Sequence, residues 1–299
     1  MVIKIGYVPE HFSTPLHMSN ENGYFTEAGV EVELVCCPGG TGEMTSKLKD
    51  GSINLAVALT EGLTAGIANG QDWYKIVGTY VSAPLCWALS AGVDSKHDSI
   101  ATLNHTDVAI SRFGSGSHIM AFVLADQQGW LAPNVKENPP FTFTALSNFK
   151  AMRDAVNAGT SDFFMWETFT TKPYHDSGEV KRIGQITPPW PAFCFAASTS
   201  LLEEDSEGVK KALEAINKAT KLFIAQKDKE SVEHIMRILD YQEVDVREWF
   251  KTVRYQDNLR DVSRKALDVT VETLIKAGVI EKPLSAEKLV DSGIANIIA

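Results

Sequence analysis

A loop rich in serine and glycine gives the strongest chemical signal in the sequence. Residues 111–117 (SRFGSGS) follow an apolar strand pattern and precede a helical one. Backbone N–H groups, hydroxyls and the positive end of a helix dipole at such a position favour a sulfonate, phosphate or carboxylate. Arg112 adds a forked donor for the same group. We therefore predict that an anion is bound by Arg112, Gly114, Ser115, Gly116 and Ser117. The alternative is an ordinary strand-to-helix turn with a solvated arginine.

Three other expected helix starts carry candidate polar groups. Gly40 and Thr41 follow one strand, Thr60 and Glu61 follow another, and Glu167 follows a third. A threonine in this position commonly caps the helix, so capping is the alternative role. The two glutamates are candidates to accept a hydrogen bond from an amino or ring N–H of a ligand. Acidic residues are also common in a first helical turn, where they offset the helix dipole.

Aromatic side chains near the expected strand ends are candidates to stack on a flat ligand. Trp166 ends a strand directly before a helix, and Trp190 stands in the proline-rich segment 188–191. Such rings suit a planar heterocycle such as a pyrimidine better than bare taurine or nitrate. The further candidates are Tyr7, Pro9, His11, Phe12 and Tyr80. Packing in the core is the alternative for the rings of Tyr7, Phe12 and Tyr80, and a solvated or hydrogen-bonded histidine is the alternative for His11.

The sequence indicates no catalytic residue, no metal site and no cofactor. The four cysteines, Cys36, Cys37, Cys86 and Cys194, lie in or beside apolar runs, and the seven histidines are scattered. Neither a C-x-x-C nor an H-E-x-x-H motif occurs. We therefore expect free thiols in a reducing compartment. We also expect a protein that binds its ligand without transforming it.

Composition restricts the possible partners. The chain has 299 residues, 44% of them hydrophobic and 22% charged, with a formal net charge of −10. These fractions are typical of a globular protein, and the acidic balance disfavours nucleic acid. No apolar run reaches the ~20 residues that span a bilayer, so membrane insertion is not expected. Residues 1–7 begin directly with a strand pattern and show no secretory signal, which predicts a cytoplasmic protein. No protein partner is indicated.

Strands and helices alternate along the chain, which predicts an α/β fold with mostly parallel sheets. The expected strands are 3–8, 30–35, 53–58, 75–80 and 85–90 in a first unit and 108–111, 141–146, 162–166 and 180–186 in a second. A last strand, 193–198, is too isolated to form its own sheet and is expected to return to the first. Helical patterns then cover 206–227, 229–239, 246–252, 259–277 and 286–289.

This order predicts two lobes joined by a hinge. Lobe I comprises 1–91 and 190–299, lobe II comprises 92–189, and the hinge lies near 90–92 and 187–191. We expect a ligand cleft between the lobes, because ligand sites favour domain interfaces and the carboxyl ends of strands.

Several motifs, taken in order, resemble the substrate-binding proteins of sulfonate-, taurine- and nitrate-type ABC transporters. They are GYVP at 6–9, PL at 15–16, GYF at 23–25, GVEVELV at 29–35, GGTG at 39–42, DGSINLA at 50–56, KIVG at 75–78, GSGS at 114–117 and WE at 166–167. The resemblance implies a two-lobed type II periplasmic-binding-protein fold, with a mostly parallel sheet flanked by helices in each lobe and extra C-terminal helices. Proteins of this family close on a small solute.

A version without a signal is similar to fungal cytosolic members of this superfamily, which are related to the thiamine-pyrimidine synthases. Those enzymes use a lysine for pyridoxal phosphate, a nearby histidine and a cysteine cluster. This chain has Ala58, Gly62 and the single Cys194 at the corresponding places, and a Schiff base needs an amine. We therefore predict a cytosolic small-molecule binding protein. The alternatives are an enzyme of thiamine-pyrimidine biosynthesis or related metabolism, and a transporter receptor lacking its signal sequence.

Overall fold

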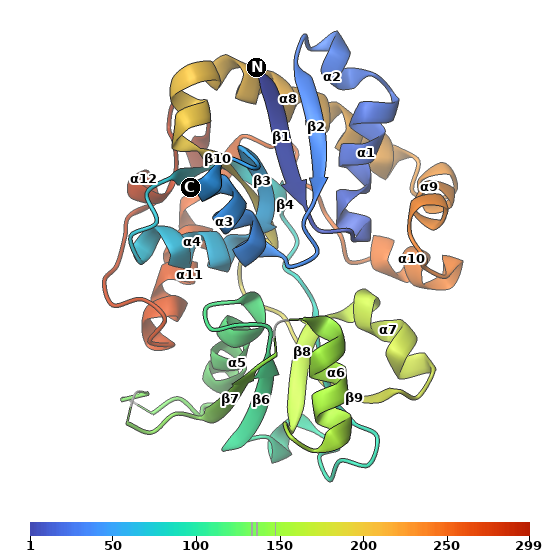
Figure 1. The fold of residues 1–299 in the computed structure, drawn as a ribbon, viewed down its shortest axis with the longest axis vertical. Helices are drawn as coiled ribbons and strands as arrows, with labels where there is room; N and C mark the ends of the chain where they lie inside the picture. Colours follow the sequence, from blue (N-terminus) through green and yellow to red (C-terminus); the bar gives the residue numbers. More distant parts are fainter. Residues whose placement is uncertain (133, 136, 147) are drawn as a thin grey trace. The chain divides into compact units, whose positions relative to one another are not determined.

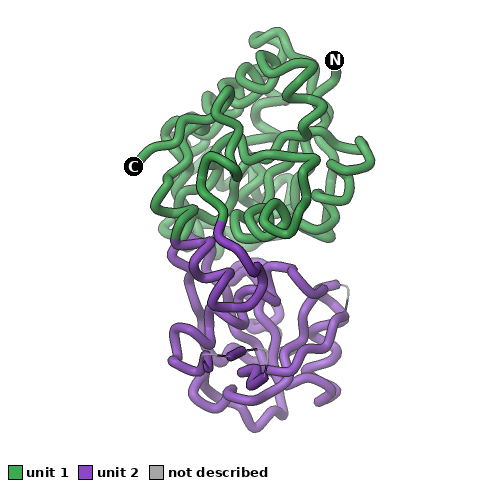
Figure 2. Tube along the Cα trace, turned by 90° about the vertical axis from the view of Figure 1, so that its left-hand side faces the viewer, with its two compact units in different colours: residues 1–83, 190–268, 284–299 green, residues 84–189, 269–283 purple. Residues whose placement is uncertain are grey.

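The chain folds into two compact units. The computed structural model describes residues 1–132, 134–135, 137–146 and 148–299. Unit 1 comprises residues 1–83, 190–268 and 284–299, and unit 2 comprises 84–189 and 269–283 (Figure 2). The sequence had placed the first boundary near 91 and all of 190–299 in lobe I. The observed first boundary lies near residue 84, because β5 (Trp87–Gly92) pairs with two strands of the second sheet and so places residues 84–91 in unit 2.

The sheet of unit 1 has the strand order β2-β1-β3-β10-β4 (Figure 1). The strands are β1 (Val2–Tyr7), β2 (Glu31–Cys36), β3 (Leu55–Leu59), β4 (Tyr74–Val81) and β10 (Phe193–Ser198). The late strand β10 lies between β3 and β4 and runs antiparallel to both, while the other four strands share one direction. All six residues of β10 are buried, as a central strand requires. The expected return of this strand to the first sheet is therefore observed.

The helices of unit 1 are α1 (Thr14–Glu21), α2 (Tyr24–Glu27), α3 (Thr41–Asp50), α4 (Thr60–Ala68), α8 (Thr199–Ala225), α9 (Glu230–Ile238), α10 (Glu243–Phe250) and α12 (Ala286–Leu289), with the 3-10 turn η1 (His11–Ser13). Helix α8 begins seven residues before the expected start at 206. Its first turns are capped by Ser198, and the helix is interrupted at Asp205, whose backbone is not helical. The carboxylate of Asp205 then accepts from Gly208 N–H at 2.9 Å and caps the remainder. The sequence pattern had detected only this second part.

Unit 2 is built on a second five-stranded sheet, in the order β7-β6-β8-β5-β9. Its elements are β5, η2 (Ile100–Thr102), β6 (Thr106–Ile110), α5 (Gly116–Gln127), β7 (Phe141–Ala145), α6 (Phe149–Ala158), β8 (Phe163–Glu167), α7 (Thr168–Asp176) and β9 (Val180–Ile186). Here β5 is the one strand that runs against the other four. Helix α6 covers part of the sheet through Met152 and Val156, which pack with Phe164.

The C-terminal region departs from the expected pattern at one place. The helix predicted from 259 begins only at Arg264, because Asp261–Ser263 forms the strand β11, which pairs with β12 (Asn296–Ile298). The following helix α11 (Arg264–Lys276) contributes its first residues to unit 1 and the rest to unit 2. Among the described residues, no helix is long and apolar enough to cross a membrane.

Strand direction brings the predicted site residues to one edge of each sheet. In unit 1, β1, β2 and β3 end and β10 begins at the same edge, as the register pairs Tyr7 with Cys36 and Leu59 with Phe193. In unit 2, β6 and β8 end where β5 begins, and Trp87 pairs with Glu167. Ligands of open α/β sheets bind at such carboxyl edges.

Candidate functional site

The loop 111–117 of unit 2 is held in shape by its own side chains. Ser115 caps α5, with its Oγ accepting from His118 N–H at 3.4 Å and lying 2.9 Å from Ser117 Oγ. Ser117 Oγ in turn accepts from Ser111 N–H at 3.2 Å. Gly114 has a φ of +76°, a conformation that favours glycine. Both hydroxyls, which were predicted as ligand donors, therefore have partners within the loop and position it.

Backbone amides and one guanidinium remain as donors at this loop. The N–H groups of Gly116 and Ser117 begin α5 and make no hydrogen bond within the described part of the chain. The side chain of Arg112 is partly buried and, among the described residues, has no hydrogen bond and no ion pair. Burial lowers the pKa of Arg112. A partly desolvated cation and the unbonded amides at a helix start are each stabilised by an anion.

An exposed aromatic ring in the same loop was missed by the sequence analysis. Phe113 is 65% exposed, and its ring centroid lies 5.4 Å from that of His118 and 6.3 Å from that of Phe143. Burial lowers the pKa of His118 to about 4, so the imidazole is neutral at pH 7, and Nδ1 accepts from Gly114 N–H at 3.1 Å. The loop therefore offers an apolar surface beside its cationic group. A phenylalanine inside a glycine- and serine-rich turn is the signal that could have revealed it.

A buried carboxyl group is the central feature of the carboxyl edge of unit 1. Glu61, 1% exposed, lies in the first turn of α4, and its Oε2 accepts from Trp190 Nε1 at 2.9 Å. Its Oε1 is buried without a hydrogen-bond partner among the described residues. Burial raises the pKa of Glu61 to about 7. The structure thus brings Glu61 and Trp190 into contact, and one carboxyl oxygen is left to accept a further hydrogen bond.

The threonine at the same helix start is used structurally. Thr60 Oγ1 donates to the Pro191 carbonyl at 2.6 Å and lies 3.3 Å from Cys194 Sγ. Thr60 N–H donates to the Ala192 carbonyl at 3.1 Å. These bonds fix the segment that carries Trp190 against the start of α4.

The second glutamate caps its own helix. Glu167, 4% exposed, precedes α7, and its Oε2 accepts from Thr170 N–H at 2.6 Å. Burial raises the pKa of Glu167 to about 7, although backbone hydrogen bonds from Thr168, Phe169 and Thr170 act to lower it. Trp166, beside it, stacks on Phe149 with ring centroids 5.1 Å apart. Trp166 is partly buried with Phe149 as a packing partner, and its contact with a ligand stays a prediction.

Three predicted residues of unit 1 lie in an aromatic core. His11 and Tyr80 are 1% and 0% exposed, and Phe12 is also buried. The ring of His11 lies 4.4 Å from that of Trp249, and burial lowers the pKa of His11 to about 3. The Tyr80 hydroxyl donates to the Phe12 carbonyl at 2.8 Å. All three side chains pack in the core of unit 1, which is the alternative interpretation for Phe12 and Tyr80.

The remaining predicted residues shape the loops at the same edge. Gly40 begins α3 with a φ of +70°, and Thr41 Oγ1 accepts from Leu59 N–H at 3.0 Å, which ties α3 to β3. Tyr7 ends β1 and packs edge-on against His17, with ring centroids 5.0 Å apart. Pro9 is exposed in the loop that follows.

No metal-binding cluster is found in the part of the chain that the structure describes. Those residues contain no group of three histidine, cysteine or acidic side chains placed to hold a metal ion. Ala58 is fully buried on β3, and all four cysteines are free thiols. Glu61, Trp190 and the loop 111–117 are the features that could hold a ligand.

Comparison with known proteins identifies the family. A family model described as Ca3427-like PBP matches residues 87–186. The structure of the CA3427 gene product of Candida albicans, described as defining a family with the generic periplasmic-binding-protein fold, is 34% identical. The match covers 100% of this chain and 98% of that one, with a TM-score of 0.90. This chain belongs to the Ca3427-like family. The type II periplasmic-binding-protein relationship expected from the motifs is thereby confirmed.

Solved structures with much lower sequence identity share the fold. The alkanesulfonate-binding protein SsuA from Xanthomonas axonopodis pv. citri has a TM-score of 0.79 at 16% identity, covering 97% of this chain and 98% of that one. The nitrate-binding protein NrtA from Synechocystis PCC 6803 has a TM-score of 0.69 at 14% identity, and the match covers 96% of this chain and 83% of that one. No curated protein matches the chain.

Proposed function

We propose that this Ca3427-like protein binds a small molecule whose anionic group is held by the loop 111–117. The observation that carries the proposal is that one loop holds Arg112, a partly buried arginine with no ion pair among the described residues, and the N–H groups of Gly116 and Ser117, which make no hydrogen bond there. A sulfonate, phosphate or carboxylate would accept from both kinds of donor. The sulfonate- and nitrate-binding relatives support an anion as the ligand class.

We also propose that the ligand carries an N–H donor. Glu61 Oε1 is buried and has no partner among the described residues, while Oε2 is occupied by Trp190. A buried acceptor without a donor is costly, and an amino or ring N–H of a ligand would satisfy it. An aminosulfonate or an aminopyrimidine with an acidic substituent has both groups. The exposed ring of Phe113 favours the heterocycle, since it offers a face for stacking.

Binding is proposed to shift the chain from an open to a closed arrangement of its units, as expected for this fold. The radius of gyration from small-angle scattering should then fall when saturating ligand is added. We propose a cytoplasmic location as well, supported by four free thiols that include the adjacent Cys36 and Cys37. Cell fractionation tests this point.

The function is tested by ligand release and thermal stabilisation. Native mass spectrometry of the purified protein should reveal a bound small acid that denaturation releases. A thermal-shift panel of MOPS, inorganic phosphate, nitrate and 4-aminopyrimidine should show stabilisation by an anion, of about 2.7 kcal/mol at 100 times Kd. Absence of a released acid, together with no stabilisation by any anion, would contradict the proposal.

A further inference from the structure

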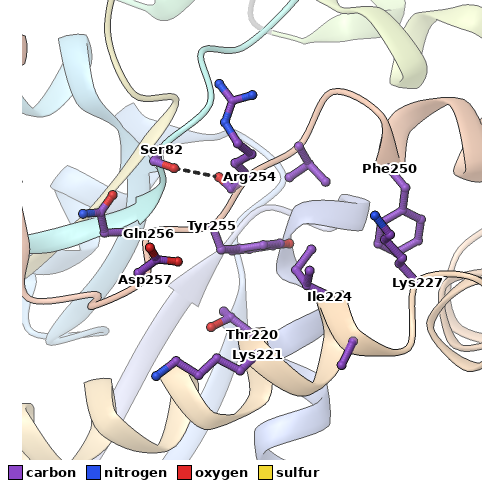
Figure 3. A pocket seen from close by; sticks show the side chains of 12 residues that line it. Ser82, Thr220, Lys221, Ile224, Lys227, Phe250, Arg254, Tyr255, Gln256 and Asp257 are labelled. Atoms are coloured by element: carbon purple, nitrogen blue, oxygen red, sulfur yellow. Dashed lines mark hydrogen bonds between the residues drawn. The ribbon is translucent and has the colours of Figure 1, made fainter.

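Unit 1 contains a cavity that none of the predicted site residues lines. It measures about 580 Å³ and opens between α8 and residues 250–257, from the last residue of α10 onward (Figure 3). Small-molecule sites in proteins typically measure ~300–1,000 Å³, so the cavity has a suitable size for a ligand. It lies apart in sequence from both the loop 111–117 and Glu61.

The wall of this cavity is fixed by main-chain hydrogen bonds. The Arg254 carbonyl accepts from Ser82 N–H at 2.8 Å and from Ala83 N–H at 3.2 Å. Gln256 N–H donates to the Tyr80 carbonyl at 3.0 Å, and Val81 forms a β-bridge with Tyr255. The segment is therefore attached to the end of β4 and the residues that follow it. A pre-formed wall lowers the ordering cost of binding.

The floor of the cavity is apolar and aromatic. Ile224 from α8, Phe250 and Val253 line it together with Tyr255, which lies near the centre of the view in Figure 3. The Tyr255 hydroxyl donates to the Phe12 carbonyl at 2.9 Å, so the polar end of this side chain is already satisfied. The ring is 9% exposed and packs against Tyr80 and Phe223, so it forms the base of the floor. The partly exposed side chains of Ile224 and Phe250 provide the apolar surface that suits a flat hydrocarbon or aromatic group.

The rim of the cavity is cationic. Lys221, Lys227 and Arg254 line it against a single carboxylate, Asp257. None of the three cations has an ion pair among the described residues, whereas Lys218 on the same helix pairs with Glu27 at 2.5 Å. In Figure 3, Arg254 extends on one side of the Tyr255 ring and Lys221 on the other. A positive rim in a chain of net charge −10 selects an anionic ligand.

We propose that this pocket is a second ligand site, which takes a small aromatic carboxylate. The aromatic ring would pack on Ile224 and Phe250 above Tyr255, and the carboxylate would be held by the three rim cations. Cationic side chains on long stems can turn toward a bound carboxylate, because all three are solvent-exposed. The site is independent of the proposed function at the loop 111–117, since the two share no residue.

Isothermal titration of the full chain with 2-naphthoate tests the pocket. Ala225 is exposed and lines the cavity, so Ala225→Trp fills it from the surface of α8 without disturbing the core. A second variant, Lys221→Gln/Lys227→Gln/Arg254→Gln, removes the rim charge. The control Lys218→Gln removes one positive charge from α8 at a residue that does not line the cavity. Circular dichroism of each variant checks the fold.

The wild type and Lys218→Gln are expected to bind 2-naphthoate saturably with the same affinity. Ala225→Trp should bind 2-naphthoate at least about tenfold more weakly, because the tryptophan occupies the space of the naphthalene ring. The triple glutamine variant should show a similar loss, because the carboxylate loses its cationic partners. The absence of saturable binding by the wild type overturns the proposal. Binding that persists at full strength in Ala225→Trp also overturns it, because the probe then sits elsewhere.

Discussion

Replacing the buried Glu61 by glutamine should remove a large part of the pH dependence of stability. Burial raises the pKa of this carboxyl from 4.5 to about 7 in the folded chain. The fold therefore favours the protonated form, so its stability is full below pH 4.5 and falls as the pH rises to about 7. At 1.36 kcal/mol per pKa unit, the loss between pH 5 and pH 8 amounts to about 2.5 kcal/mol. Glutamine keeps an acceptor for Trp190 Nε1 and cannot ionise.

The assay is urea unfolding followed by circular dichroism at pH 5 and pH 8. The wild type should lose about 2.5 kcal/mol more than Glu61→Gln between the two pH values. Glu167, whose pKa burial also raises to about 7, remains in both proteins and cancels in the comparison. The control is Glu33→Gln, which removes an exposed carboxylate from β2. An identical pH dependence in the wild type and Glu61→Gln would refute the reasoning.

Three substitutions test two contacts at the carboxyl edges of the sheets and one between β4 and Leu259. Trp190→Phe removes the donor to Glu61 and should cost about 1–3 kcal/mol at pH 8, with a smaller cost at pH 5 where the carboxyl is protonated; equal costs at both pH values would contradict this. Ser115→Ala removes the cap of α5 and should lower the unfolding free energy by about 1 kcal/mol in urea melts, and an unchanged midpoint would argue against the cap. Gly78→Ala places a Cβ 2.0 Å from the Leu259 carbonyl and should destabilise by about 1–3 kcal/mol, so a wild-type Tm would show that the backbone can separate there.

The strands were largely predictable because their apolar runs must be buried. All ten strands of the two sheets lie within about two residues of the positions expected from alternation and apolar runs. The unit boundary near residue 84 was not predictable in the same way. An apolar strand such as Trp87–Gly92 can pair in either sheet, and only the register with Phe163–Glu167 decides which. The start of helix α11 at Arg264 was not predicted, because the preceding strand β11 is short and depends on pairing with residues 296–298.

The sheet edges at which the candidate residues lie were predictable, whereas the contacts of these residues were less so. Strand direction alone brings the loop 111–117 and Glu167 to one edge, and Glu61 and Trp190 to another. Burial then separates core from surface in a way that residue type does not reveal. His11 and Tyr80 resemble ligand contacts in the sequence but are fully packed, whereas Phe113 resembles a core residue but is exposed. The pocket beside α8 is lined by Ser82, by residues within 220–227 and by residues within 250–257. These segments are separate in the chain, so no local sequence pattern predicts the pocket.

The most direct test of anion binding is calorimetric titration of Arg112→Met with the anion that stabilises the wild type most. Arg182→Met, which removes an exposed arginine from β9 of the same unit, is the matched control. Loss of one partner from a desolvated, hydrogen-bonded charge pair costs about 2–4 kcal/mol, or roughly 30- to 1,000-fold in affinity. We predict such a loss in Arg112→Met and wild-type affinity in Arg182→Met. Wild-type affinity in Arg112→Met would contradict the assignment of the loop 111–117 as the anion site.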